Sequence, residues 1–211
     1  MATPYVTAHL GEVPSTQDEA RDRFAEIPVL VTAASQSAGR GRSNNEWWNA
    51  PRLVAASLAF EPSWPTANWP RLALVAGLAA RDVLPGLWLE WPNDLVVCDG
   101  KVGGILAEAD AEAVTVGLGL NLFWPDAPDG VGAVYGADPG EDAATAIAEA
   151  WCESLLDRAN ADRDEWGSIS TGRLARRSAP TSSGSPAAPA ALLTSIWTEL
   201  WSWRRAREPS R

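Results

Sequence analysis

Four short strand-like segments separated by tight turns occupy residues 87–122, and this stretch limits the fold more than any other part of the chain. The segments read LWLEW, DLVVC, VGGILAEA and AVTVGLGLNL. They are rich in residues that pack well on a pleated sheet, and the Asp-Gly pair between the second and third is typical of a β-hairpin. The stretch therefore predicts a run of neighbouring strands, with an antiparallel pair at the hairpin.

The segments on both sides of this stretch complete an α+β pattern. Ser15 or Thr16 is predicted to be the N-cap of a first helix, because acidic residues follow in its first turn. Strands are expected within residues 27–35 and 52–60, and helices within residues 14–26, 68–84 and 141–166. We therefore expect an α+β domain whose sheet is mixed or mostly antiparallel and is flanked by helices.

Charge and composition exclude several classes of protein. The net charge of −10 argues against nucleic acid as a partner, because neutralising phosphates requires a basic surface. The sequence shows neither the pattern of a signal peptide nor an apolar run long enough to span a bilayer. Cys98 and Cys152 lack metal-ligand spacing and fit buried or incidental thiols. We expect a soluble protein of the reducing cytoplasm.

Residues 35–48, SQSAGRGRSNNEWW, combine glycines, arginines and tryptophans in one expected loop. Glycines let backbone N–H groups approach an anion, and arginines offer planar pairs of donors for phosphate or carboxylate groups. Taken alone, a Gly-Arg loop is more often a solvated hairpin or a disordered link than a ligand cradle. The loop becomes a candidate site only when other motifs join it.

A second motif covers residues 90–108, EWPNDLVVCDGKVGGILAE. Asn93 and Asp94 place an amide and a carboxylate at a strand start, where they could hold a metal-bound phosphate and a purine or ribose. Lys101 follows at the exit of the expected hairpin, where a lysine is usually a solvated turn residue. The glycines after it would nevertheless let a ligand lie against the strand backbone. Residues 117–121, GLGLN, again place glycines in an expected strand and end on an amide side chain.

Together these motifs resemble the catalytic domain of biotin protein ligases, also called biotin–[acetyl-CoA-carboxylase] ligases. The family's STN motif appears at residues 15–17, its Q-x-A-G-R-G-R motif at 36–42 and its KWPND motif at 90–94. K-x-x-G-I-L-x-E appears at residues 101–108 and G-x-G-x-N at 117–121. The five motifs follow one another in the family's order and at its spacing over about residues 14–125.

The resemblance implies an ATP-dependent ligase that forms biotinyl-5′-AMP and transfers biotin to a lysine of a biotin carboxyl carrier domain. It implies a class II synthetase-like fold, ATP and Mg²⁺ as cofactors, biotin as the substrate, and a monomer or weak dimer. Because 14 residues precede Ser15, we expect the monofunctional type without an N-terminal DNA-binding domain.

The same resemblance assigns roles to individual residues. Lys101 and Arg42 are the expected catalytic residues, since a lysine ammonium can bridge two anions that must react, and Asp94 is the expected metal ligand. Trp47 is expected to stack on the adenine. Biotin is expected to contact Ser15, Thr16, Gln17, Gln36, Arg40, Gly41, Arg42, Lys101 and Gly104. ATP or the adenylate is expected to contact Arg40, Arg42, Trp47, Asn93, Asp94, Gly117, Gly119 and Asn121.

Three departures from the family pattern reduce positive charge or change a polar group near the expected phosphates. Residues 43–46, Ser-Asn-Asn-Glu, replace a more basic run, Glu90 replaces the usual lysine, and Gln17 replaces the usual asparagine. They predict weaker binding of ATP or the adenylate than is typical of the family. Two alternatives stay open: a lipoate-type acyl ligase of the same fold, and a non-catalytic biotin-binding pseudoenzyme or damaged-gene product.

The composition changes abruptly near Trp166. Residues 167–211 contain no aspartate, are dense in Ser, Ala, Pro and Arg, and show no strand alternation. Back-translated parts of this segment resemble the family's C-terminal barrel in a shifted frame, so we interpret the segment as the product of a frame shift and expect the barrel to be missing. The predicted organisation is a catalytic domain over residues 1–166 and an aberrant, largely disordered tail, with at most a short helix near residues 190–205.

Overall fold

The computed structural model describes residues 3–97, 100–110 and 113–161. These ranges include every residue assigned to the expected site. The domain boundary near Trp166, the tail predicted over residues 167–211 and its short helix lie outside the described residues, and so does Cys98.

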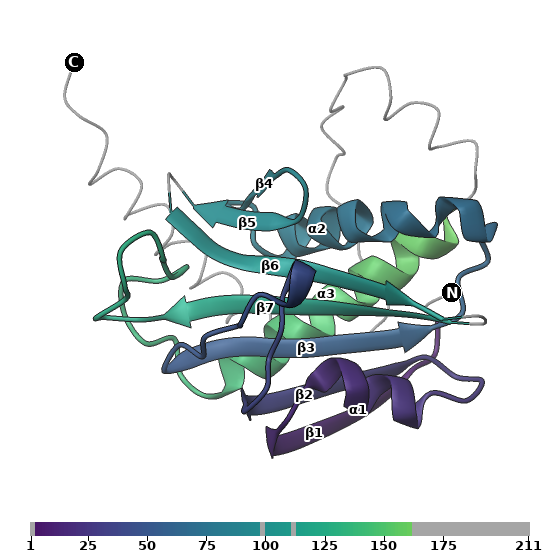
Figure 1. Cartoon of the computed structure of the whole chain (residues 1–211), viewed down its shortest axis with the longest axis horizontal. Coiled ribbons are helices and arrows are strands. Elements are labelled where there is room, and N and C mark those ends of the chain that lie inside the picture. Colours follow the sequence, from purple (N-terminus) through teal and green to yellow (C-terminus); the bar gives the residue numbers. More distant parts are fainter. Residues whose placement is uncertain (1–2, 98–99, 111–112, 162–211) are drawn as a thin grey trace, which may run out of the picture.

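A seven-stranded mixed sheet forms the centre of the described fold (Figure 1). The strand order is β1-β2-β3-β7-β6-β5-β4, with β1 parallel to β2 and every other neighbouring pair antiparallel. The strands are β1 (Val6–Val13), β2 (Val29–Gln36), β3 (Arg52–Phe60), β4 (Trp88–Glu90), β5 (Asp94–Val97), β6 (Gly100–Ala109) and β7 (Val114–Phe123). The predicted mixed sheet is confirmed, as is the hairpin of β5 and β6, in which Val97 pairs with Gly100.

Within the described residues, three α-helices cover the two faces of the sheet unequally (Figure 1). The helices are α1 (Thr16–Arg23), α2 (Leu72–Val83) and α3 (Asp142–Asn160), and short 3-10 segments occupy Arg42–Asn44 and Thr66–Arg71. Helices α2 and α3 pack against each other on one face and form the main hydrophobic core with the sheet. Helix α1 lies on the opposite face, over β2, β3 and β7. The predicted α+β architecture is therefore confirmed.

Strand β7 shows how the sequence separates the core from the site. Its even-numbered residues are apolar and buried in the main core: Val114, Val116, Leu118, Leu120 and Leu122. The residues between them are small or polar: Thr115, Gly117, Gly119 and Asn121. Because successive side chains of a strand point to opposite faces, this second set lies on the face that carries α1. One strand thus closes the core and provides a floor without bulky side chains.

One strand and two helix boundaries differ from the prediction. Strand β1 was not predicted, because its sequence VTAHLGEV has a histidine and a glycine among its apolar residues and lies largely exposed at the sheet edge. The helix expected from residue 68 begins as a 3-10 segment that contains Pro70 and becomes α-helical at Leu72, since proline has no N–H to donate. Helix α3 ends at Asn160, where the next residue is already extended.

Ser15, one of the two N-cap candidates from the sequence, occupies the N-cap position of α1, but its hydroxyl does not cap the helix. The Ser15 backbone is extended, and its Oγ accepts a hydrogen bond from Nη1 of Arg40 at 3.0 Å. The start of the helix was therefore predicted correctly, while the serine hydroxyl serves to connect α1 with the Gly-Arg loop.

Candidate functional site

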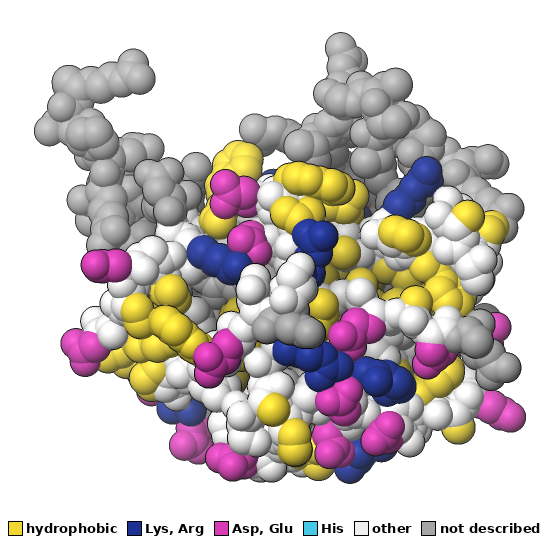
Figure 2. All heavy atoms as spheres, in the orientation of Figure 1, with side chains coloured by type: hydrophobic (Ala, Val, Ile, Leu, Met, Phe, Trp, Pro, Cys, Tyr) yellow, Lys and Arg dark blue, Asp and Glu magenta, His cyan; other side chains and the backbone are white. Residues whose placement is uncertain are grey.

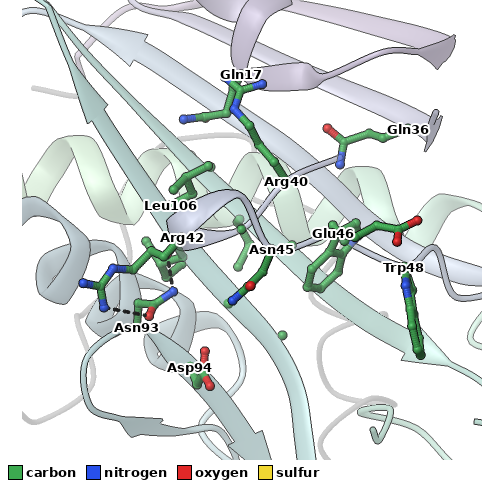
Figure 3. Close-up of a pocket in the computed structure, with 18 of the residues that line it drawn as sticks. Gln17, Gln36, Arg40, Arg42, Asn45, Glu46, Trp48, Asn93, Asp94 and Leu106 are labelled. Atoms are coloured by element: carbon green, nitrogen blue, oxygen red, sulfur yellow. Dashed lines mark hydrogen bonds between the residues drawn. The ribbon is translucent and has the colours of Figure 1, made fainter. Parts of the chain in front are cut away.

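An open cavity of about 540 Å³ lies over the sheet, beside the start of α1 and beneath the Gly-Arg loop between β2 and β3 (Figure 3). Every residue predicted to bind biotin, to bind the adenylate or to react lines this one cavity. These residues are Ser15, Thr16, Gln17, Gln36, Arg40, Gly41, Arg42, Trp47, Asn93, Asp94, Lys101, Gly104, Gly117, Gly119 and Asn121. Motifs that are up to about a hundred residues apart therefore meet in space, while the role of each residue stays a prediction.

Other residues, to which the sequence analysis assigned no role, also line the cavity. They include Trp48, Ala56, Ser57, Ile105, Leu106, Leu118, Trp124 and Val131. Ser57 had one detectable signal, a hydroxyl within the otherwise apolar run LVAASLAF. Trp124 and Val131 had none, because they belong to the irregular segment between β7 and α3, whose path the sequence does not reveal.

A buried network of neutral hydrogen bonds forms the end of the cavity next to α1. Oε1 of Gln36 accepts a hydrogen bond from the backbone N–H of Thr16 at 2.8 Å and from its hydroxyl at 3.1 Å. The hydroxyls of Thr16 and Ser57 lie 2.8 Å apart. Thr16 is 3% exposed and Ser57 is fully buried. Because buried polar groups must be paired, this network fixes Gln36 against α1 and leaves little freedom at this end.

Two glycines of β7 make room for larger side chains of the site. A methyl group on Gly117 would lie 2.8 Å from Oε1 of Gln17, and one on Gly119 would lie 2.9 Å from the ring of Trp47. Gln17 in turn donates from Nε2 to Glu108 and to the backbone carbonyl of Thr115, both at 3.2 Å. The glycines are therefore required by close packing, and the Trp47 ring lies directly over the β7 backbone.

The Gly-Arg loop closes on itself as a short hairpin. The N–H of Gly41 donates to the carbonyl of Asn45 at 2.7 Å, and the N–H of Trp47 donates to the carbonyl of Gly39 at 3.0 Å. At the tip Ser43 has a φ of +57°, a left-handed conformation that non-glycine residues seldom adopt. The loop is thus closed by its own backbone hydrogen bonds and lies over the cavity.

Arg40 anchors this loop to its surroundings. Its guanidinium donates to both carboxylate oxygens of Asp18 at 2.9 Å and to both oxygens of Glu108 at 3.3 and 3.0 Å. The hydrogen bond from Arg40, more than any other interaction, lowers the pKa of Asp18 below its ordinary value. The same bond, followed by the one to Glu108, raises the pKa of Arg40. The two directions agree, so this is a charged cluster that stays ionised around neutral pH.

Arg42 reaches the other side of the cavity, where it meets Asn93 (Figure 3). Its Nη1 donates to Oδ1 of Asn93 at 3.5 Å, a long and weak hydrogen bond. Nδ2 of Asn93 donates to the carbonyl of Ile105 at 2.9 Å, which fixes the amide against β6. Arg42 is exposed, so most of its guanidinium can turn toward a ligand.

Lys101 and Asp94 form an ion pair on neighbouring strands. Nζ of Lys101 lies 2.8 Å from Oδ1 of Asp94, and the two side chains are 48% and 31% exposed. Gly104 lies opposite Asp94 in the β5–β6 pairing, and a methyl group there would meet no atom closer than 3.5 Å. The lysine ammonium therefore stands at the edge of open space over the strand backbone.

Asn121 closes the floor of the cavity near Lys101. Its Nδ2 donates to the carbonyl of Gly132 at 3.1 Å, and the N–H of Gly132 donates to the carbonyl of Lys101 at 2.7 Å. Oδ1 of Asn121 is buried and has no hydrogen-bond partner among the described residues. An unsatisfied buried acceptor is costly, so this atom is suited to a water or a ligand donor.

The expected metal site has a single carboxylate. Within residues 3–97, 100–110 and 113–161, no three His, Cys, Asp or Glu side chains gather so that they could hold a metal ion. Mg²⁺ is commonly bound through one or two carboxylates together with substrate phosphates. Asp94 thus fits a Mg²⁺ that arrives with a nucleotide and does not fit an ion held by the protein alone.

The residues that depart from the family pattern differ in their distance from the site. Ser43, Asn45, Glu46 and Gln17 line the cavity, whereas Glu90 lies exposed on β4 outside the cavity lining. Lys and Arg side chains on this face lie next to Asp and Glu side chains and form no single cationic patch (Figure 2). The predicted weakening of phosphate binding therefore depends on the loop residues more than on Glu90.

Two features away from the cavity bear on the other expectations. In the described part of the chain, no helix has both the length and the apolar composition needed to cross a bilayer. Cys152 is fully buried on α3, and this burial raises the pKa of its thiol, so the predicted buried cysteine is confirmed.

The sequence pattern of the biotin/lipoate A/B protein ligase family matches residues 10–121 of the chain. A biotin–[acetyl-CoA-carboxylase] ligase of Paracoccus denitrificans is 37% identical over an alignment of 121 residues, which covers 52% of this chain and 50% of that protein. The enzyme of the same name from Mycobacterium tuberculosis is 36% identical over an alignment of 104 residues, which covers 44% of this chain and 39% of that protein. The chain thus matches half or less of the length of these curated relatives.

Solved structures show the same fold. A biotin protein ligase from Aquifex aeolicus in complex with biotin and ATP superposes with a TM-score of 0.65 at 25% identity, over 77% of this chain and 76% of that one. A biotin protein ligase from Leishmania major in complex with biotin has a TM-score of 0.63 at 22% identity, over 86% and 87%. The mixed sheet with its flanking helices is therefore the fold of these ligase structures, as the sequence predicted.

Proposed function

The chain belongs to the biotin/lipoate A/B protein ligase family, and from this membership and the cavity we propose that it is an ATP-dependent biotin protein ligase. It activates biotin as biotinyl-5′-AMP and transfers the biotinyl group to a lysine of a biotin carboxyl carrier domain. In keeping with its composition and its buried thiol, we propose that it acts in the cytoplasm without nucleic acid, as a monomer or weak dimer.

One observation carries this proposal. Residues from five separate motifs converge on a single cavity that combines a buried neutral end with an exposed charged end. Biotin has a neutral ring system and a carboxylate tail, so a neutral hydrogen-bonding end followed by cationic groups is complementary to it. The named relatives, more than 30% identical to this chain, are biotin ligases, which favours biotin over other acids.

The first half-reaction joins two anions. The carboxylate oxygen of biotin attacks the α-phosphorus of Mg–ATP, a new O–P bond forms, and the bond to the β-phosphate breaks to release pyrophosphate. Lys101 is the catalytic residue of this proposal, because its ammonium can move from Asp94 to lie between the carboxylate and the α-phosphate. Such a preorganised cation offsets their repulsion and stabilises the charge that develops in the transition state.

The second half-reaction uses an amine from the carrier domain. The neutral amine of the lysine attacks the carbonyl carbon of the mixed anhydride and loses a proton to solvent as the amide bond forms, and AMP leaves with the electron pair of the broken C–O bond. The intermediate is prone to hydrolysis, so it must be kept from water between the two steps. The Gly-Arg loop, with Arg42 and Trp47 over the cavity, is placed to do this.

The remaining residues of the cavity hold the two substrates. Thr16 and Gln36 would meet the biotin rings at the neutral end, and Gly104 would let biotin lie against β6. Trp47 would stack on the adenine, and Asn93 and Asn121 would serve ATP. Asp94 would contact the Mg²⁺ that ATP brings, which neutralises phosphate charge.

A lipoate-type ligase is the second candidate, because the matching family includes lipoate ligases. Pyrophosphate exchange into ATP separates the two candidates. We expect exchange that depends on biotin and is not supported by lipoate at the same concentration. Exchange driven by lipoate would establish the second candidate. Binding of biotin without any exchange would identify a non-catalytic biotin-binding protein.

A further inference from the structure

The guanidinium of Arg40 has no donor left for a ligand. A guanidinium carries five N–H bonds, and Arg40 uses all five within the protein. Two go to Asp18, two to Glu108 and one to Ser15, at 2.9 to 3.3 Å. Such bidentate, charge-assisted pairs are the strongest class of hydrogen bond between side chains.

Arg42, two residues along the same loop, differs in this respect. It donates one long hydrogen bond to the described residues, to Asn93 at 3.5 Å, and it is exposed. Figure 3 shows the two side chains extending in different directions, Arg40 toward Gln17 and Arg42 toward Asn93. Of the two arginines, Arg42 alone has donors to offer to a phosphate or a carboxylate without first breaking charged pairs.

Arg40 also connects three elements that are distant in sequence. Its backbone forms an antiparallel β-bridge with the backbone of Glu46 at the base of the loop hairpin. Its side chain reaches Asp18 on α1 and Glu108 on β6. Asp18 and Glu108 are not part of the cavity lining, so neither is placed to contact a ligand there. They can influence the site only through the groups they hold.

We propose that Arg40 is a positioning residue, which ties the Gly-Arg loop to α1 and β6 through Asp18 and Glu108 and so holds Arg42 and Trp47 over the cavity. This replaces the direct contact with biotin and the adenylate that the family resemblance implied for Arg40. The consequence for catalysis rests on the proposed function, whereas the anchoring of the loop does not.

The test compares Asp18→Ala, Arg40→Gln and the control Arg21→Ala. Arg21 also donates to Asp18 and Glu108, at 3.0 and 3.3 Å, but it does not line the cavity. Its removal takes a cation from the same cluster and leaves the anchor in place. Hydrogen–deuterium exchange of the peptide over residues 37–48, without ligand, reports the order of the loop, and peptides from α2 and α3 report the fold.

We expect the loop peptide to exchange about fivefold faster in Asp18→Ala and Arg40→Gln, and at the wild-type rate in Arg21→Ala. Opening the loop breaks fewer charged pairs in Asp18→Ala, where Arg40 keeps only Glu108, and none in Arg40→Gln. The double variant Asp18→Ala/Arg40→Gln should exchange no faster than Arg40→Gln. Unchanged exchange in Asp18→Ala would overturn the proposal. If helix peptides also exchange faster, Asp18→Asn takes the place of Asp18→Ala, with the same expectation.

The second readout is the share of newly formed biotinyl-5′-AMP that escapes into solvent, with biotin and Mg–ATP as the ligands. A positioning role predicts about tenfold more escape in Asp18→Ala as in Arg40→Gln, because both loosen the same loop. A contact role predicts the opposite for Asp18→Ala, since its loss would release donors of Arg40 toward the adenylate. If the wild type forms no adenylate, the proposed function fails, while the exchange experiment still decides the role of Arg40.

Discussion

The two ends of the cavity use their polar groups in opposite ways. At the α1 end, Thr16, Gln36 and Ser57 are neutral and satisfy one another within the folded chain. At the other end, Arg42 is exposed and holds its partner weakly, and Lys101 forms one partly exposed ion pair. At the first end only Oε1 of Gln17 is left as a buried acceptor without a partner among the described residues, whereas the second end has charge and donors to offer.

This difference follows from the cost of burial. A buried hydroxyl or amide must find its partners when the chain folds, so the hydrogen bonds at the α1 end contribute to the stability of the fold. An exposed cation keeps its hydration and can exchange one partner for another at little cost. We therefore expect substitutions at the α1 end to lower stability first, and substitutions at the charged end to lower the reaction rate first.

The largest effect is expected at Lys101. Replacing it with alanine should raise the barrier to adenylate formation by about 2–4 kcal/mol, the usual loss for one preorganised electrostatic contact. The melting temperature should stay near that of the wild type, because the side chain is 48% exposed. Pyrophosphate exchange measures the first effect, and thermal unfolding measures the second.

Arg158→Ala is the matched control for this substitution. Arg158 is a partly exposed cation that pairs with Asp82 between α2 and α3, on the opposite face of the sheet. Its loss should leave pyrophosphate exchange unchanged. If Lys101→Ala also leaves the exchange unchanged, Lys101 has no part in the reaction and the charged end loses its assigned role.

Substitution at the α1 end of the cavity should lower the stability of the fold. Thr16→Val removes a hydroxyl that bonds both Gln36 and Ser57, and it leaves a buried serine with one partner fewer. The free energy of unfolding should fall by about 1–3 kcal/mol, the typical cost of an unpaired buried polar group. The double variant Thr16→Val/Ser57→Ala should recover part of this loss, because both partners are then removed. A single variant as stable as the wild type, measured by urea unfolding, would show that the network does not support the fold.

A smaller effect is expected for Arg42→Gly. Biotin should bind almost as in the wild type, while about tenfold more adenylate escapes, equivalent to about 1.4 kcal/mol. Escaped adenylate should label lysines of a bystander protein such as albumin. Lys101 is the only lysine in this sequence, so labelling of the protein itself contributes little background. Labelling confined to the carrier domain would show that Arg42 does not retain the intermediate.

The smallest effect concerns pH and the cluster that anchors the loop. Asp18 contacts Arg40 from the loop and Arg21 on its own helix, and both arginines also donate to Glu108 of β6. Its pKa is lowered from 3.8 in the folded state, so its contribution to stability is complete above that value and is lost as the pH falls through the folded pKa. Asp18→Asn should therefore cost less than about 1 kcal/mol near pH 6, because the carboxylate is half exposed.

The measurement is the free energy of unfolding of both proteins between about pH 6 and pH 2. The difference between them should be constant above about pH 5 and should shrink once the pH drops below 3.8. A difference that grows toward acid pH would contradict the sign of this pKa shift.

Local sequence signals predicted the helices, most of the strands and the motif residues of the cavity. The helix at residues 16–23 and the hairpin of β5 and β6 have signals within a few residues, and both are present. Strand β1 was missed because an exposed edge strand does not need an apolar alternation. Trp124 and Val131 were not predicted to line the cavity, because an irregular segment has no periodic pattern of apolar residues that shows where it packs.

The role of Arg40 shows a different limit. Its residue type and its place in the motif suggested a contact with anions, and the sequence does not reveal that its donors are already occupied. The partners lie 22 and 68 residues away, and only the packing of α1 and β6 brings them together. A motif therefore identified the loop, and the fold decided which of its arginines is available to a ligand.

The most direct test of the proposed activity is biotin transfer itself. The chain is incubated with biotin, Mg–ATP and a biotin carboxyl carrier domain, and the intact mass of the carrier is measured with and without ATP. We predict the gain of one biotinyl group on a single carrier lysine, dependent on ATP and strongly reduced in Lys101→Ala. An unmodified carrier, together with no biotin-dependent pyrophosphate exchange, would contradict the proposed ligase function.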